Sequence, residues 1–123
     1  MKKIRVTREV WLKLKPIRLV EDFEIISDGS IIIVAPVEPK GLLSRVLRFL
    51  SIVPPPSYKR FILDKTGGKI WLMCDGSKSI DDIIKALMRE SGMSRRNIEL
   101  AVYNYINMLV SKGLIALIPP EDK

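Results

Sequence analysis

The chain contains no histidine, no glutamine and only one cysteine, and these absences exclude several kinds of site. Without histidine it lacks the commonest metal ligand and the usual base at neutral pH. Histidine-containing zinc sites, Cys-His catalysis and Ser-His-Asp triads are therefore excluded. The single Cys74 excludes an internal disulfide framework and favours a reducing compartment. We expect no metal, no cofactor and no enzymatic activity.

Long apolar runs are also missing. The longest, near residues 31–37 and 114–120, are far too short to span a bilayer, and the charged N-terminus does not look like a signal peptide. We therefore expect a cytoplasmic protein without a transmembrane segment. The lack of glutamine, together with abundant Lys, Arg and Ile, is typical of heat-adapted (thermophilic) proteins.

The net charge of +7 is concentrated near the N-terminus. Residues 1–18 contain seven basic side chains and one acidic side chain, Glu9, so the rest of the chain is nearly neutral. Such a basic arm either keeps the protein soluble or contacts a nucleic acid or an acidic partner. Within it, the apolar segment Val10–Leu14 is expected to form an extra edge strand or to lie as an arm on the domain.

Strand patterns follow the arm. Residues 23–26 and 31–34 are apolar runs joined by Ser27-Asp28-Gly29-Ser30, and Asp-Gly between β-branched runs predicts a hairpin. We expect Pro36 and Pro39 to end the second strand, because proline cannot donate a hydrogen bond within a sheet. Tyr58–Leu63 is predicted to be the third strand.

Between these strands lies an insertion, residues 40–57, that contains a helical pattern at about 41–53. Its polar residues form one narrow stripe, the remainder is apolar, and Pro54-Pro55-Pro56 ends it. The helix either packs on the domain's own sheet, pairs with a second copy, contacts a partner or lies on a membrane surface.

Three helices are predicted after the third strand. Asp64 or Thr66 begins the first, which Asp75-Gly76 closes; Ser79 begins the second, which Gly92 ends; Ser94 begins the third, which runs to Lys112. Leu114–Ile118 is expected to form a closing strand or wing. Two other motifs do not predict a site. Thr66–Lys69 lacks the spacing of a phosphate-binding loop. Asp81 and Asp82 are better explained by their place at the positive end of a helix than as ligands of a metal.

The third helix carries two apolar stripes. One contains Ile98, Val102, Tyr105 and Leu109 and is expected to face the core. The other contains Arg96, Leu100, Tyr103 and Asn107. A helix buried on one side needs only the first stripe, so the second is either covered by the N-terminal segment or the inserted helix, or is a contact surface.

At Leu63-Asp64, Thr66-Gly67, Ile70-Trp71, Asp75-Gly76, Ile80 and Ile83, the chain resembles the PqqD family, named for pyrroloquinoline quinone biosynthesis. The resemblance covers about residues 22–118. It implies an α+β fold, with a small three-stranded antiparallel sheet followed by a three-helix, winged-helix-like bundle. The domain would then span 22–118, with the arm at 1–21 and a tail at 119–123.

The resemblance also implies a function. Members of this family are recognition elements for ribosomally made, post-translationally modified peptides (RiPPs): they bind the precursor (leader) peptide and present it to a modifying enzyme, often a radical SAM enzyme. The leader would add as a strand to the third strand and lie against the third helix. The candidate peptide-binding residues are Lys59, Arg60, Phe61, Ile62, Arg96, Leu100, Tyr103 and Asn107.

Two alternatives remain open. A winged-helix nucleic-acid-binding protein would place its third helix in a groove and its basic arm on phosphates, but Ser94–Lys112 contains only Arg95, Arg96 and Lys112, offset by Glu99. We therefore favour the peptide hypothesis over nucleic acid. A homodimer paired through the inserted helices is the other alternative.

Overall fold

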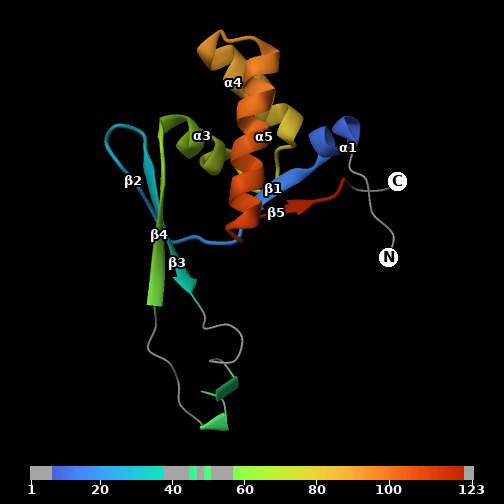
Figure 1. Cartoon of the computed structure of the whole chain (residues 1–123). Helices are drawn as coiled ribbons and strands as arrows, with labels where there is room; N and C mark the ends of the chain where they lie inside the picture. Colours follow the sequence, from blue (N-terminus) through green and yellow to red (C-terminus); the bar gives the residue numbers. More distant parts are fainter. Residues whose placement is uncertain (1–6, 38–44, 47–48, 51–56, 121–123) are drawn as a thin grey trace.

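The computed structural model describes residues 7–37, 45–46, 49–50 and 57–120. A three-stranded sheet lies on one side of a group of helices, and a two-stranded sheet lies below them (Figure 1). The described elements, in chain order, are α1 (Arg8–Lys13), β1 (Lys15–Arg18), β2 (Phe23–Ile25), β3 (Ile31–Val37), β4 (Ser57–Leu63), α3 (Lys65–Met73), α4 (Ile80–Ser91), α5 (Arg95–Ser111) and β5 (Ile115–Ile118).

The predicted hairpin is confirmed. β2 pairs antiparallel with β3, with Phe23 opposite Ile33 and Ile25 opposite Ile31. The turn between them needs a glycine at Gly29, whose φ is 92°. β3 then pairs antiparallel with β4 along its whole length, from Ile31 opposite Leu63 to Val37 opposite Ser57.

The expectation that Pro36 ends the second strand is wrong, because β3 runs through Pro36 to Val37. The backbone N–H of Val34 donates to Asp22, on the β2 side of the strand. The nitrogen of Pro36, two residues later, points to the same side of β3, and β2 does not extend that far along it. Pro36 therefore costs the sheet no hydrogen bond.

The three helix starts are capped as predicted. Asp64, Ser79 and Ser94 each accept a backbone N–H of the first turn, and Ser79 forms a reciprocal capping box with Asp82. Gly92 ends α4 in the left-handed conformation, with φ 69°. The first helix ends earlier than expected, at Met73, with Cys74 as its C-cap in place of a glycine.

The core lies between the inner face of the sheet and the helices. Alternate residues of β3 are buried, since successive strand side chains point to opposite faces. Trp71 of α3 is fully buried, and its ring meets that of Phe23 edge-on, with 5.8 Å between the ring centres. The largest fully buried side chains are Trp71, Ile31, Ile33, Ile70, Ile80, Ile83, Ile84, Ile106, Leu109, Leu114 and Val102.

The secondary structure of the segment before the hairpin differs from the one expected. Val10–Leu14 was expected to be an edge strand or an arm, but Val10 to Lys13 lie in α1 and Leu14 is its C-cap. The helix forms because Thr7 caps its first turn and Glu9 lies at its positive end. A strand does form directly afterwards: β1 pairs antiparallel with β5, with Lys15 opposite Ile118 and Arg18 opposite Ile115.

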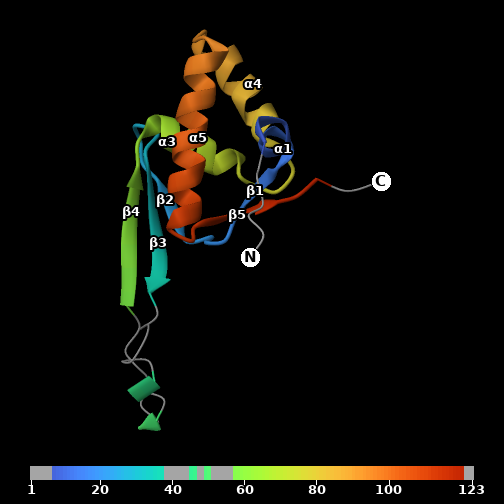
Figure 2. The same ribbon diagram turned by 45° about the vertical axis from the view of Figure 1, so that its right-hand side comes forward.

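The α+β class and the three-stranded antiparallel sheet are confirmed. The winged-helix description is approximate, because β5 pairs with β1 and not with the β2-β3-β4 sheet (Figure 2). The helix expected at 41–53 lies largely outside the described residues. None of the helices in the described part of the chain has the length and apolar character needed to cross a membrane.

Candidate functional site

β4 is the outer strand of its sheet. It hydrogen-bonds to β3 on one side, and among the described residues no strand pairs with its other side. Unpaired backbone groups on such an edge can accept a further strand. Two of its apolar side chains are strongly exposed, Tyr58 at 62% and Ile62 at 75%.

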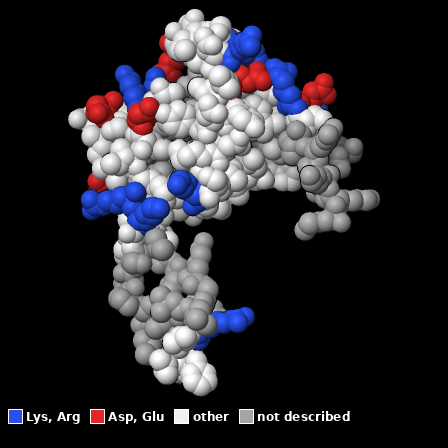
Figure 3. All heavy atoms as spheres, viewed as in Figure 1, with Lys and Arg blue, Asp and Glu red and all other residues white. Residues whose placement is uncertain are grey.

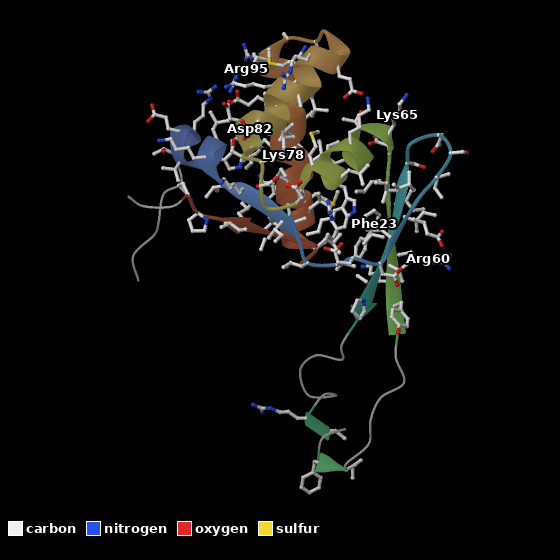
Figure 4. The ribbon with its side chains drawn as sticks, turned by 180° about the vertical axis from the view of Figure 1, so that it is seen from behind. Phe23, Arg60, Lys65, Lys78, Asp82 and Arg95 are labelled. Atoms are coloured by element: carbon white, nitrogen blue, oxygen red, sulfur yellow. The ribbon has the colours of Figure 1, made fainter. Side chains whose placement is uncertain are left out.

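The side chains of β4 divide between the two faces of the sheet. Phe61 packs against the core, and the ammonium of Lys59 lies 5.3 Å from the centre of its ring. Arg60 and Ile62 pair with Val34 and Ile32 on the opposite face. In Figure 4, Arg60 lies on the sheet away from the helices, whereas Phe23 lies between the sheet and α3. The edge thus presents two cations beside exposed apolar side chains.

The other four candidate residues lie together elsewhere. Arg96, Leu100, Tyr103 and Asn107 line one wall of a groove of about 910 Å³ between α5 and α1. From the opposite side the N-terminal segment contributes Thr7, Arg8, Trp11 and Leu14, and β5 adds Leu117. No residue of β2, β3 or β4 lines this groove.

α5 stands between the β2-β3-β4 sheet and α1 in both ribbon views (Figures 1 and 2). The structure therefore divides the eight candidate residues into two groups of four, on different sides of α5. Tyr105 of the core stripe faces the sheet side, where its hydroxyl donates to Asp64 at 2.5 Å. The outer stripe, by contrast, faces α1.

α1 is attached to α5 by an aromatic contact and an ion pair. The rings of Trp11 and Tyr103 meet edge-on, with 5.5 Å between their centres. The guanidinium of Arg8 donates to both carboxylate oxygens of Glu99, with Nε–Oε1 at 2.6 Å and Nη2–Oε2 at 3.0 Å. The outer stripe of α5 was expected either to be covered by another segment or to be a contact surface. The N-terminal segment does lie beside it, but Leu100 stays 61% exposed and Tyr103 48% exposed.

The charged residues near the groove form a chain of ion pairs. Hydrogen bonding from Arg8, and then its charge, holds the pKa of Glu99 below its usual range. Arg95 bonds to Asp81 at 2.6 Å, which lowers the pKa of that carboxyl, and also lies 3.4 Å from Glu99. Within the described residues Arg96 has no hydrogen-bonded or ion-pair partner. Among the residues that the structure describes, Arg96 is thus the groove arginine that remains available to an anion.

Sequence reasoning missed the α1 wall. Thr7, Arg8, Trp11 and Leu14 lay in a segment interpreted as a strand or arm. The signal present in the sequence was the order Thr7, Glu9, Lys13, which places a cap, an acidic first turn and a basic last turn on one short helix.

The residues of the central motif serve structure. Asp64 accepts the N–H of Gly67 at 2.8 Å and the hydroxyl of Tyr105, which holds the pKa of Asp64 below its usual range. Burial, together with this bond, raises the pKa of Tyr105 to about 12, so that it stays a donor. Cys74 is fully buried, its thiol donates to Ile70, and burial raises its pKa to about 12, as expected of a core side chain.

Among the described residues, no three or more His, Cys, Asp or Glu side chains lie together so that they could hold a metal ion. In the face shown in Figure 3, the middle of the surface is largely uncharged, and charged side chains gather above it and along the sheet. The β4 edge and the groove between α1 and α5 offer hydrogen-bonding groups, apolar area and positive charge, all of which can contribute to binding another molecule.

Comparison with known proteins gave one match. Residues 50–115, more than half of the chain, match the family described as Coenzyme PQQ synthesis protein D (PqqD). The comparison with curated proteins and the comparison with solved structures gave no match. The matched residues contain β4, α3, α4, α5 and the whole motif from Leu63 to Ile83 that first indicated the resemblance. The chain therefore belongs to the PqqD family.

Proposed function

We propose that this protein is a non-catalytic peptide-recognition protein, which binds a precursor (leader) peptide and presents it to a modifying enzyme such as a radical SAM enzyme. The observation that carries the proposal is the open edge of β4. Membership of the PqqD family supports it, since this family supplies peptide-binding partners in the biosynthesis of modified peptides.

An extended peptide would bind by adding a strand to β4. Its backbone would satisfy the unpaired N–H and C=O groups of the edge, and alternate side chains would provide specificity. Lys59 and Arg60 favour acidic residues in the peptide, while Phe61 and Ile62 favour apolar ones. Arg96, Leu100, Tyr103 and Asn107 remain proposed contact residues, but for a different occupant, because the groove that they line contains no residue of β4.

Calorimetric titration with a precursor peptide encoded beside this gene tests the proposal. We expect a dissociation constant of about 1 μM or tighter, corresponding to roughly −8 kcal/mol. Arg60→Glu should weaken binding, because it places a carboxylate beside acidic peptide residues. Arg89→Glu is the matched control, since it makes the same charge change on an exposed position of α4.

Two results would count against the proposal. One is the absence of binding to any peptide encoded nearby. The other is an equal loss of affinity in Arg60→Glu and Arg89→Glu, which would show that only overall charge matters and that the β4 edge is not the site.

A further inference from the structure

The groove between α1 and α5 has no role in strand addition at β4. One of its walls comes from residues 7–14, which lie outside the family match at 50–115. The groove is therefore a feature of this chain in addition to the part that it shares with the family. We propose that this groove docks an acidic segment of a second protein, with large apolar side chains next to its carboxylates.

Large apolar side chains of α5 remain exposed within the concave surface of the groove. Leu100 and Tyr103 remain about half exposed or more, although α1 lies directly beside them. Trp11 and Leu14 face them across the groove. Large apolar side chains left open in a concavity are typical of binding sites, and a volume of about 910 Å³ accommodates several side chains.

Most of the charged side chains on the groove are already paired. Three arginines and one carboxylate line the groove; Glu99 is engaged by Arg8 and Arg95, and Arg95 is also bonded to Asp81. Arg96 is left without a partner among the described residues. Excess positive charge around an apolar floor favours an occupant with carboxylates.

The same charge disfavours two other occupants. A second copy of this chain carries a net charge of +7, and the residues before Thr7 include Lys2, Lys3 and Arg5. Either would bring further positive charge to a positive groove. A segment of a different protein that combines carboxylates with large apolar side chains matches both Arg96 and the apolar floor.

The groove is a different surface from the β4 edge on which the proposed function rests. Since no residue of the β2-β3-β4 sheet lines the groove, a peptide added to β4 and a protein bound at the groove do not compete for the same residues. In Figure 4, Arg95 near the groove lies at the top of the view, whereas Arg60 lies lower, on the sheet at the right. The chain can then hold a peptide and a second protein at once.

Random twelve-residue peptides displayed on phage, selected against the whole chain, provide the probe. A synthetic copy of a selected peptide is then titrated by calorimetry. We expect the selected peptides to combine Asp or Glu with Leu, Phe or Trp. Leu100→Asp and Arg96→Glu should each weaken binding by about tenfold or more. Both positions lie on the exposed side of α5, so the variants should fold.

Arg60→Glu and Arg89→Glu are the controls and should leave this binding unchanged. Four results would overturn the inference: selected peptides without acidic residues, binding that survives Leu100→Asp and Arg96→Glu together, binding lost in Arg60→Glu, or a dimer in light scattering that Leu100→Asp dissociates. Equal binding of a single-stranded twelve-nucleotide DNA, sensitive to the same variants, would also overturn it. A negative titration with the precursor peptide would leave the groove untouched, so the two proposals fail separately.

Discussion

At Gly67 and Gly68 the chain passes too close to its neighbours for any side chain. A Cβ at Gly67 would lie 2.6 Å from Cε1 of Tyr105, and a Cβ at Gly68 would lie 2.7 Å from the backbone oxygen of Gly29. These glycines let α3 approach α5 and the β2–β3 turn. The Thr66–Lys69 motif is thus explained by packing, as its poor match to a phosphate loop indicated.

Gly68→Ala should destabilise the fold. The new methyl group meets backbone at Gly29, which cannot rotate away as a side chain can, and overpacking of this kind typically costs about 1–3 kcal/mol. Urea denaturation measures the change in the free energy of unfolding. Asn104→Ala, at an exposed position of α5, is the control and should change it by less than about 0.5 kcal/mol. Equal stability of Gly68→Ala and the wild type would show that the turn moves aside freely.

Tyr105→Phe should lower stability and also change its dependence on pH. The variant loses the hydrogen bond to Asp64, worth about 1 kcal/mol. That bond lowers the pKa of Asp64 in the folded state relative to about 3.9 when unfolded. A lowered folded pKa stabilises the protein above the unfolded pKa, and this contribution is lost as pH falls through the folded value.

The wild type should therefore lose more stability on acidification below about pH 4 than Tyr105→Phe does. Denaturation of both proteins across this range measures the difference. Tyr103→Phe is the matched control, because it removes the same hydroxyl from an exposed ring on the other side of α5. Parallel pH curves for wild type and Tyr105→Phe would contradict the assignment.

α1 is a short helix with little buried side-chain surface. It is six residues long, and Trp11 is its only buried side chain. A helix this short is not stable alone in water, so its contacts with the rest of the molecule hold it.

Trp11→Ala should detach α1 while the rest of the fold persists. We expect faster amide hydrogen exchange at α1, with α3 and α4 still protected, because peripheral elements open independently of the core. Val10→Ala, at an exposed neighbouring position, should leave exchange unchanged. If protection fell equally in all helices, α1 would instead be an integral part of the core.

Elements with local signals were predictable from the sequence. Asp28-Gly29 marked the β2–β3 turn, and Ser79 with Asp82 marked the start of α4, because each depends on residues that are close in the chain. α1 was misread because a short apolar run fits a strand or a helix equally well. Its state depends on Tyr103 and Glu99, about 90 positions later.

The site was only half predictable for the same reason. The two stripes of α5 follow from helical periodicity, and Leu100 and Tyr103 were correctly separated from Val102 and Leu109. Which element each stripe faces depends on tertiary packing, and the pairing of β1 with β5 joins residues about a hundred positions apart. Sequence periodicity carries no information on either.

For the molecule as a whole, part of the basic N-terminal charge is used internally. Arg8 pairs with Glu99, and Arg18 donates to the backbone oxygens of Trp71 and Leu72 at the end of α3. Arg18 also lies 5.6 Å from the ring centre of Phe23. These two arginines are therefore already engaged within the molecule.

The open edge of β4 exposes the molecule to pairing with its own copies, and its charges oppose this. In a two-fold pairing centred on Arg60, each Arg60 faces its copy, and like charges placed opposite each other in a sheet are destabilising. Lysine on edge strands is a common protection against such pairing. Lys59 and Arg60 would therefore both attract acidic peptides and repel a second β4.

Replacing Lys59 and Arg60 together by glutamine should increase self-association, measured as mass by light scattering over a range of concentrations. The control, Lys13→Gln with Arg89→Gln, removes the same charge from α1 and α4 and should behave as the wild type. A dimer through the inserted residues would instead be lost on deletion of 41–56 and would be unaffected by the charges on β4. If both double variants associated equally, net charge and not the edge would keep the molecules apart. Association specific to the β4 variant would show that this edge is competent to pair with a strand, which is the property that the proposed peptide recognition requires.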